Sequence, residues 1–324
     1  MNTTHVVVGA SGGIGRAVCA ELARRGLPIR AVSRSGTPIE GVEAAEAVEV
    51  VAADATDAAA MRAACRDAAA VYHCVNPPFA SWRAAFPAAT RALLAAAGAA
   101  GARLVFADDT WMYGRVDGPM HEDTTVAPVS GKGVLRAWLA EMVLAAHARG
   151  EVETVIGRAP ELWGPGVESL LAGGIFAAAA RGRTARWPGD PDLPVTAGYA
   201  PDVGAALVEL ALAPASATGR VWHTPVPPPI TGRLFVEKVF AAAGHPPRVG
   251  RITPAMVAGL RLVSPVVREG AELLYQFEQP FLVDDSAYRA AFTTRATDWD
   301  SGVAATLAWY RADLERTRRR LVPA

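Results

Sequence analysis

The sequence predicts an α/β fold in which a doubly wound parallel sheet carries a smaller, interleaved C-terminal lobe. Three observations support this prediction. A glycine-rich turn joins the first apolar run to a helical stretch, apolar runs alternate with helical stretches up to Arg158, and proline-punctuated segments follow. Short apolar runs separated by helices are typical of a parallel sheet whose two faces are both covered.

The first element is an apolar strand at residues 6–8, which runs into a glycine turn and then into a helix that ends at Gly26. One glycine permits a tight turn, another lets backbone N–H groups approach a phosphate, and a third lets the helix pack closely on the strand. Such spacing also arises by chance in a simple loop. The flanking strand and helix favour a dinucleotide site, and its expected residues are Gly9, Ser11, Gly12, Gly13, Ile14 and Gly15.

Six apolar runs predict the strands of the sheet. They span residues 6–8, 29–32, 48–52, 70–74, 104–107 and 153–157. We expect residues 1–158 to form the nucleotide-binding domain, with residues 196–224 returning to it through an N-capped amphipathic helix that starts at Asp202. Residues 159–195 and 225–324 are expected to form the substrate-binding lobe.

The composition excludes several classes of partner. Lys plus Arg equals Asp plus Glu at 32 each, so no basic excess indicates nucleic acid or an anionic membrane. Cys19, Cys65 and Cys74 are odd in number and lack metal-ligand spacing, which predicts free core thiols, a reducing cytoplasm and no metal site. The alanine-rich stretches are interrupted before they reach bilayer length. We therefore expect a soluble cytoplasmic protein whose partner is a small molecule.

The end of the second predicted strand favours NADP(H), with NAD(H) as the less favoured cofactor. No acid stands there to bind a ribose hydroxyl, whereas Arg34 can pair with a 2′-phosphate and Ser33 and Ser35 can donate hydroxyl bonds. The alternative is that Arg34 is a solvated turn residue. Asp54 and Ala55 follow the third strand, where the carboxylate is expected to accept from the adenine amino group. The alternative is that this segment serves the next helix, with Thr56 or Asp57 as its N-cap.

In the order of its motifs, the chain resembles the extended short-chain dehydrogenase/reductase superfamily, in particular its NAD-dependent epimerase/dehydratase branch. The matching pieces span nearly the whole chain and are residues 9–15, Asp54, residues 71–76, residues 106–114, residues 158–166 and residues 199–203. The resemblance implies a Rossmann fold that binds NAD(P), with the substrate held by a smaller C-terminal lobe.

Members of this superfamily usually carry a catalytic Tyr-x-x-x-Lys pair, which this chain lacks. Lys132 stands at the tyrosine position and Arg136 at the lysine position, while Asp109 replaces the usual Ser/Thr helper and Thr110 is adjacent. Arg136 can still bind a ribose but cannot transfer a proton near neutral pH. Lys132 can act as acid or base if burial and Arg136 lower its pKa, although Asp109 opposes this. Tyr113 is a further candidate proton donor.

Other segments of the resemblance supply candidate contacts. Asn76 and Arg136, together with the turn at Pro160 and Leu162, are expected to contact the cofactor. Aromatic side chains near the cleft are the substrate candidates, or else they fill the core. They are Phe79, Trp82, Trp111, Trp163 and Tyr199. Further aromatics at Trp187, Phe277 and Phe281 suggest an apolar or polycyclic substrate.

The leading interpretation is an NADP(H)-dependent oxidoreductase that transfers hydride to or from a carbinol or ketone. A second is an isomerase, epimerase, dehydratase or cyclase in which the cofactor is structural or recycled, with Asp109 and Lys132 as acid and base. A third is a non-catalytic NADP-binding sensor. The resemblance also implies a possible homodimer through helices near residues 82–98 and 132–149.

Overall fold

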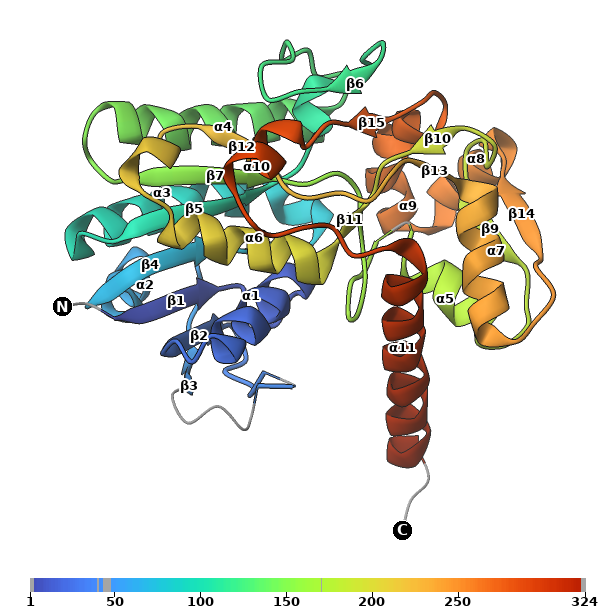
Figure 1. Ribbon diagram of the computed structural model, residues 1–324, viewed down its shortest axis with the longest axis horizontal. Coiled ribbons are helices and arrows are strands. Elements are labelled where there is room, and N and C mark those ends of the chain that lie inside the picture. Colours follow the sequence, from blue (N-terminus) through green and yellow to red (C-terminus); the bar gives the residue numbers. More distant parts are fainter. Residues whose placement is uncertain (1–2, 40, 43–47, 170, 322–324) are drawn as a thin grey trace.

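The computed structural model describes residues 3–39, 41–42, 48–169 and 171–321, and a seven-stranded parallel sheet forms its centre (Figure 1). The strand order is β12-β7-β5-β4-β1-β2-β3, and each strand runs parallel to its neighbours. The strands are β1 (Thr4–Val8), β2 (Ile29–Ser33), β3 (Val48–Ala52), β4 (Ala68–His73), β5 (Arg103–Asp108), β7 (Thr154–Arg158) and β12 (Val221–His223). The predicted doubly wound sheet is confirmed.

Alternation along the strands provides both faces of the sheet with apolar side chains. Val7 packs in one core cluster, while Val6 and Val8 pack in another on the opposite face. Helices α1 (Gly13–Arg24) and α6 (Ala200–Leu212) cover the first face. Helices α2 (Ala58–Ala64), α3 (Trp82–Ala100) and α4 (Gly131–Ala148) cover the second face (Figure 1).

The six predicted strands all exist, with ends that differ by at most two residues from the expected ones. The seventh, β12, is only three residues long and has no periodic signal. The predicted start of the returning helix, at Asp202, was wrong. Helix α6 begins at Ala200, and Asp202 lies in its first turn, where the carboxylate accepts from the backbone N and Oγ1 of Thr297 at 2.7 Å.

The C-terminal lobe has its own core, built largely of aromatic rings. Trp163, Trp187, Phe277 and Phe281 are 0 to 3% exposed and pack against helices and short strands of the lobe. These aromatics therefore stabilise the lobe and do not form a substrate surface, which removes the basis for expecting an apolar or polycyclic substrate. The lobe contains α5 (Gly173–Ala179), β9 (Ala185–Pro188), β10 (Pro194–Val195), β13 (Ile230–Thr231), α7 (Gly232–Ala243), β14 (Val249–Ile252), α8 (Pro254–Val263), α9 (Pro265–Gly270), η4 (Ala271–Phe277) and α11 (Trp299–Leu321).

Short elements connect the lobe to the sheet. Helix α10 (Ser286–Ala291), although it falls within the predicted lobe, packs on β12, and its Tyr288 donates to Glu209 of α6 at 2.7 Å. The remaining elements are η1 (Phe79–Ser81), η2 (Trp111–Tyr113), β6 (Pro119–Met120), β8 (Leu162–Trp163), β11 (Gly198–Tyr199), η3 (Ala215–Ala217) and β15 (Leu282–Val283). Within the described ranges, no helix is both long and apolar enough to cross a membrane.

The three cysteines are buried and free, as predicted. Burial raises the pKa of the Cys19 thiol to about 12 and that of the Cys65 thiol to about 11. Thiols of this kind are inert packing groups rather than nucleophiles or metal ligands. The cysteines therefore belong to the sheet domain's core and not to its chemistry.

The glycine turn is held by close backbone contacts. Gly9 has φ +86°, and a Cβ there would lie 2.5 Å from the carbonyl oxygen of Cys74. A Cβ on Gly15 would lie 2.2 Å from the carbonyl oxygen of Gly9, so only glycine lets α1 approach the turn this closely. At Gly12 the nearest atom to such a Cβ is 3.4 Å away, which leaves room for a methyl group.

A pair of alanine substitutions tests this packing. We expect Gly15→Ala to lower the free energy of unfolding by about 1–3 kcal/mol or more, because backbone must move to admit the methyl group. Gly12→Ala should change it by less than about 0.5 kcal/mol. Urea unfolding followed by circular dichroism measures both, and equal stabilities for the two variants would contradict the packing described.

Candidate functional site

The site begins at the carboxyl ends of the central strands, where the glycine turn meets α1. Gly12 is the N-cap of α1 and carries no capping side chain, and no acidic residue occupies the first turn of the helix. Ser11 and Gly12 are exposed, so the first backbone N–H groups of α1 are accessible to an anion. This cradle fits the pyrophosphate of a dinucleotide, because at Gly12 the one atom within 4 Å of an added Cβ is the Gly9 carbonyl oxygen, at 3.4 Å, which leaves the start of the helix open.

The turn after β2 places the predicted adenosine contacts. Arg34 is exposed at the end of the strand. Ser33 is buried and its Oγ accepts from the backbone N of Gly36 at 3.2 Å, while the Ser35 hydroxyl contacts the Thr37 hydroxyl. The two serines therefore form hydrogen bonds within the turn, and both Arg34 and Ser35 are exposed to solvent.

The acidic segment after β3 resolves one of the predicted alternatives. Asp57 caps α2 by accepting from the backbone N atoms of Ala59 and Ala60. Asp54 is exposed next to half-buried Ala55, and one of its oxygens accepts from Thr56. These hydrogen bonds lower the pKa of Asp54, to which the charge of Arg34 also contributes. Asp54 thus stays a charged acceptor near the end of the sheet.

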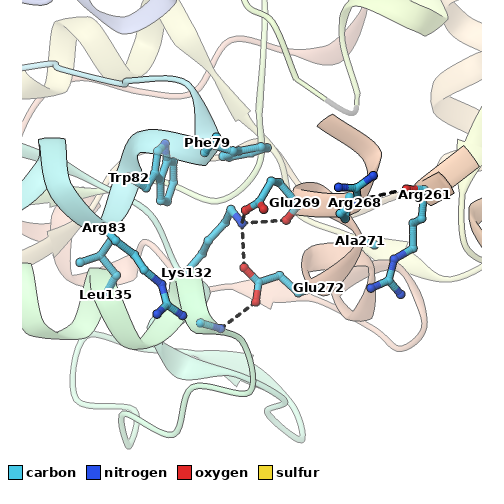
Figure 2. A pocket seen from close by; sticks show the side chains of 12 residues that line it. Phe79, Trp82, Arg83, Lys132, Leu135, Arg261, Arg268, Glu269, Ala271 and Glu272 are labelled. Atoms are coloured by element: carbon cyan, nitrogen blue, oxygen red, sulfur yellow. Dashed lines mark hydrogen bonds and ion pairs between the residues drawn. The ribbon is translucent and has the colours of Figure 1, made fainter. Parts of the chain in front are cut away.

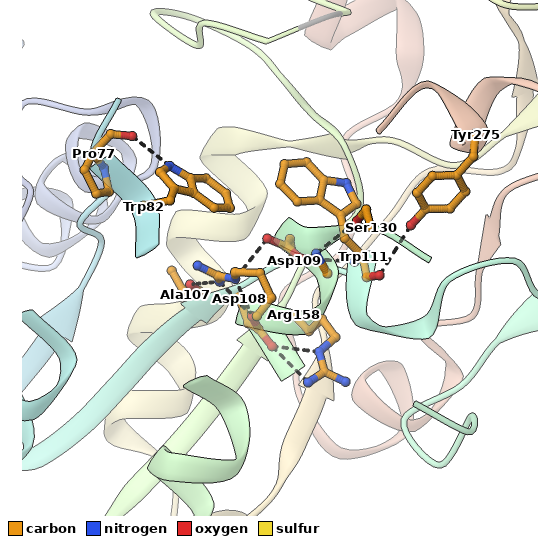
Figure 3. Close-up of polar contacts among 11 residues, drawn as sticks. Pro77, Trp82, Ala107, Asp108, Asp109, Trp111, Ser130, Arg158 and Tyr275 are labelled. Atoms are coloured by element: carbon orange, nitrogen blue, oxygen red, sulfur yellow. Dashed lines mark hydrogen bonds and ion pairs between the residues drawn. The ribbon is translucent and has the colours of Figure 1, made fainter. Parts of the chain in front are cut away.

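A buried ionic network lies at the ends of β5 and β7 (Figure 3). Arg136 of α4 donates to Oδ1 of Asp108 at 2.7 Å, and the Arg158 guanidinium contacts Oδ2 at 2.9 Å. The three side chains are at most 5% exposed. The Arg136 guanidinium also lies between the rings of Phe86 and Phe106, at 5.1 and 5.0 Å from their centroids. Asp108 therefore pairs with two buried cations at once.

Asp109 is the partly exposed end of this network. Its Oδ2 lies 2.9 Å from Nε of Arg136, and its Oδ1 accepts from the backbone N of Trp111 at 3.0 Å. Burial raises the pKa of Asp109 to about 6, because desolvation outweighs the charge of Arg136. Its side chain retains 20% exposure. Among the carboxylates of the network, Asp109 is thus the one that can be reached and that titrates near neutral pH.

Tyr113 and Thr110 are buried. Arg158 donates to the Tyr113 oxygen at 2.7 Å, and Tyr113 contacts Nε2 of His223 at 2.8 Å. Because Nδ1 of His223 lies 2.9 Å from the carbonyl oxygen of Asp284, which can only accept, Tyr113 must donate to Nε2. Burial lowers the pKa of His223. Tyr113 is 1% exposed and Thr110 is 0% exposed, so both lie within the protein.

The Lys132 ammonium is held by acceptors of the C-terminal lobe. Its Nζ lies 2.7 Å from the carbonyl oxygen of Glu269, 3.0 Å from Oε2 of that residue and 2.8 Å from Oε1 of Glu272. An ammonium has three N–H donors, and these three acceptors use them all. Arg136 points to Asp108 and Asp109 instead. The predicted influence of Arg136 on Lys132 is therefore replaced by two carboxylates from the lobe.

A pocket of about 540 Å³ opens over Lys132, between the starts of α3 and α4 and the α8–α9–η4 region (Figure 2). Phe79 and Trp82, two of the substrate candidates, are among the residues that line it. Trp111 stacks on Trp82 with centroids 5.7 Å apart. The other lining residues are Ala80, Arg83, Gly131, Leu135, Arg261, Arg268, Glu269, Ala271 and Glu272. Half of the lining residues carry a charged side chain.

The remaining residues predicted to contact cofactor or substrate differ in their exposure. Asn76 is exposed after β4, while Pro160 is buried and the Leu162 carbonyl accepts from Ser169. Trp163 and Tyr199 are 0 and 5% exposed and pack against each other in the lobe core. The structure therefore gives Trp163 and Tyr199 a packing role and does not bring them to the pocket.

The structure adds residues that sequence reasoning missed. Asp108 and Arg158 are direct partners in the pairing of β5 with β7, so their positions at two predicted strand ends carried a usable signal. Glu269 and Glu272 lie about 140 residues beyond Lys132 in short helices, and no local pattern indicates them. In the part of the chain that the structure describes, no group of three or more His, Cys, Asp or Glu is placed to hold a metal ion.

Comparison with known proteins gives a family and a shared fold. The sequence model of the NAD dependent epimerase/dehydratase family matches residues 5–222. No match was found among curated proteins.

Three solved structures illustrate the fold. A dTDP-glucose 4,6-dehydratase from Bacillus anthracis in complex with NAD is 15% identical, with a TM-score of 0.80 over 97% of this chain and 98% of that one. A UDP-glucuronic acid 4-epimerase from Bacillus cereus in complex with NAD is 15% identical, with a TM-score of 0.77 over 95% and 99%. A putative epimerase from Burkholderia cenocepacia is 21% identical, with a TM-score of 0.76 over 96% and 98%.

Removing the shared carboxylate tests the network. Among the described residues, Asp108→Asn leaves the buried Arg158 guanidinium without a carboxylate partner and Arg136 with Asp109 alone, so we expect the free energy of unfolding to fall by about 3–5 kcal/mol. Asp192→Asn is the matched control, because Asp192 pairs with Arg233 on the surface at 62% exposure and should cost at most about 1 kcal/mol. Chemical denaturation measures both, and a loss at Asp108 no larger than the control would contradict the network's role.

Proposed function

The chain belongs to the NAD dependent epimerase/dehydratase family, and from this premise we propose that it is an NADP(H)-dependent enzyme acting on a hydroxyl- or carbonyl-bearing carbon of a small, charged substrate. The observation that carries the proposal is the adjacency of two features at the carboxyl edge of one sheet. These are the anion cradle at the start of α1 and the network of Asp109 and Arg136 at the end of β5. A bound nicotinamide cofactor would supply hydride transfer to or from the substrate carbon.

NADP(H) is the proposed cofactor because Arg34 is the charged residue at the end of β2 and is exposed there. A guanidinium forms charge-assisted bonds with a 2′-phosphate, and no acid precedes it to bind a ribose hydroxyl. The Bacillus anthracis and Bacillus cereus structures hold NAD, so this preference is a property proposed for this chain alone.

Asp109 is the proposed acid and base. It stands where the family's hydroxyl helper is expected, is partly exposed, and has a pKa raised by burial to about 6. As a carboxylate it would accept the proton of a substrate hydroxyl, and as an acid it would return it to a carbonyl oxygen. Arg136 holds the Asp109 side chain and can donate to a ribose. Lys132 contributes positive charge beside the pocket, although its three N–H donors are already engaged.

The lobe formed by residues 159–195 and 225–324 is proposed to hold the substrate. Half of the residues that line the pocket beside it are charged, which supports a polar substrate. Two of the similar solved structures, a dTDP-glucose 4,6-dehydratase and a UDP-glucuronic acid 4-epimerase, are of enzymes named for polar substrates. Both arguments point away from the apolar or polycyclic substrate that the aromatic composition suggested.

A homodimer through α3 and α4 is also proposed. Val134 and Trp138 lie one turn apart on α4 and are 54 and 44% exposed, so an apolar strip faces away from the sheet. A second copy of α3 and α4 would cover it. Three free thiols in the core support a reducing, cytoplasmic location for this assembly.

The reaction type is tested by incubating the protein and cofactor with a panel of hydroxylated and carbonyl compounds. Net redox chemistry changes the absorbance of the reduced nicotinamide, whereas an isomerase or dehydratase converts its substrate without consuming cofactor. Tightly retained nucleotide in the purified protein favours the recycled cofactor. A protein that binds NADP(H) and converts no compound of the panel would contradict the enzymatic proposal and favour a sensor.

Arg34→Ala tests the cofactor preference. We expect NADP(H) binding to weaken by about tenfold or more, because a charge-assisted contact with the 2′-phosphate is lost, while NAD(H) binding changes less than about twofold. The matched control is Arg24→Ala, which removes an exposed cation of α1 that pairs with Glu21. Calorimetric titration measures both cofactors. Equal affinities for the two cofactors in the unmodified protein, or no effect of Arg34→Ala, would contradict the preference.

The ionisation of Asp109 is testable without a substrate. In protein carrying carbon-13 at the aspartate carboxyl groups, one resonance should titrate with a midpoint near pH 6 and be absent from Asp109→Asn. Arg136→Ala should move that midpoint upward, because the cation stabilises the carboxylate. Oxidation of a hydroxyl, which needs the base, should then slow as the pH falls below about 6. Titration of every aspartate near its ordinary pKa would contradict this role.

A further inference from the structure

We propose that the pocket over Lys132 selects a substrate with at least two negative charges, and that Arg83, Arg261 and Arg268 recognise it. This inference rests on the proposed function, since it names the substrate class of the same site. The pocket contains four cationic side chains against two carboxylates, an excess of two positive charges in a protein whose formal net charge is zero.

The carboxylates of the pocket are already engaged. Glu272 contacts Lys132 with Oε1 and accepts from the backbone N of Gly131 with Oε2 at 2.8 Å, and Glu269 contacts Lys132 with Oε2. Although burial opposes it, the hydrogen bonds from Lys132 and Gly131 lower the pKa of Glu272. Both groups are therefore fixed on the lysine and the start of α4, and neither is available to the pocket arginines.

The three arginines have no counter-ion of their own. In the described parts of the chain, none of them forms an ion pair with a carboxylate, and Arg268 donates only to the carbonyl oxygen of Arg261 at 3.1 Å. All three are exposed. Elsewhere on the surface, exposed arginines such as Arg115 and Arg233 pair with nearby acids. Unpaired guanidinium groups gathered around one cavity favour an anionic ligand.

The arrangement of the arginines specifies two anionic groups. Arg83, from the first turn of α3, lies on one side of Lys132, while Arg261 and Arg268, from α8 and α9, lie on the other (Figure 2). Phe79 lies next to Lys132, with its ring centroid 5.0 Å from Nζ, and supplies an apolar surface beside the charges. A molecule with an anion at each end and a short body between them satisfies both sides.

Carboxylate and phosphate groups both match a guanidinium, so two probes separate them. The experiment titrates succinate and inorganic pyrophosphate into protein saturated with NADP⁺, which prevents either probe from binding in the glycine turn. Acetate, with one charge, is the comparison. We expect at least one dianion to bind saturably, to exceed acetate by about tenfold or more, and to weaken as salt is added.

Arg83→Gln and Arg261→Gln should each weaken binding of that dianion by about tenfold, with NADP⁺ affinity unchanged. Arg233→Gln, which removes a paired surface arginine of the lobe, should bind it like the unmodified protein. A preference for succinate assigns a dicarboxylate, and one for pyrophosphate assigns a phosphorylated substrate. The proposal is overturned if neither dianion binds saturably, or if both arginine variants bind it normally.

The cofactor titration keeps the two proposals distinct. If NADP⁺ fails to bind the unmodified protein, the proposed function fails, and the pocket is then tested by comparing dianion binding of the unmodified protein and Arg83→Gln without cofactor. An effect of Arg83→Gln in that comparison supports anion recognition alone, and its absence overturns the inference.

Discussion

The contact of two buried guanidinium groups with Asp108 is the interaction on which the site depends. Burying an unpaired cation is costly, and Asp108 is the carboxylate that Arg136 and Arg158 share, with Asp109 as a second partner of Arg136. The contact joins the end of β5, the end of β7 and the first turns of α4. It therefore fixes the carboxyl edge of the sheet where the chemistry is proposed, and it holds Arg136 in a position to contact Asp109.

The residues at the site differ from the tyrosine and lysine that the family resemblance implies. A buried carboxylate with a pKa near 6 occupies the helper position, and an arginine that cannot lose its proton occupies the lysine position. The lysine at the tyrosine position contacts two glutamates. Proton transfer is consequently proposed for Asp109, while Lys132 joins α4 to the lobe and lines the pocket.

Much of the fold was predictable because periodic apolar runs determine strands, and a glycine turn after a strand determines the start of α1. The site was predictable only in part. Asp109, Arg136 and Phe79 follow from position along the chain, but the partners of Lys132 come from short helices of the lobe, and only the folded chain brings them there. Trp163 was expected either to contact the substrate or to fill the core, because the sequence around an aromatic residue next to a glycine turn does not distinguish the two. In the structure it fills the core.

The measurement that tests the account most directly is a crystal structure of the protein with NADP⁺. The account predicts the pyrophosphate at the start of α1, the 2′-phosphate at Arg34, and the nicotinamide end of the cofactor beside Asp109 and Arg136, with the contact between Arg136 and Asp108 retained. A cofactor whose nicotinamide lies away from Asp109, or a bound state in which Arg136 has left Asp108, would contradict it.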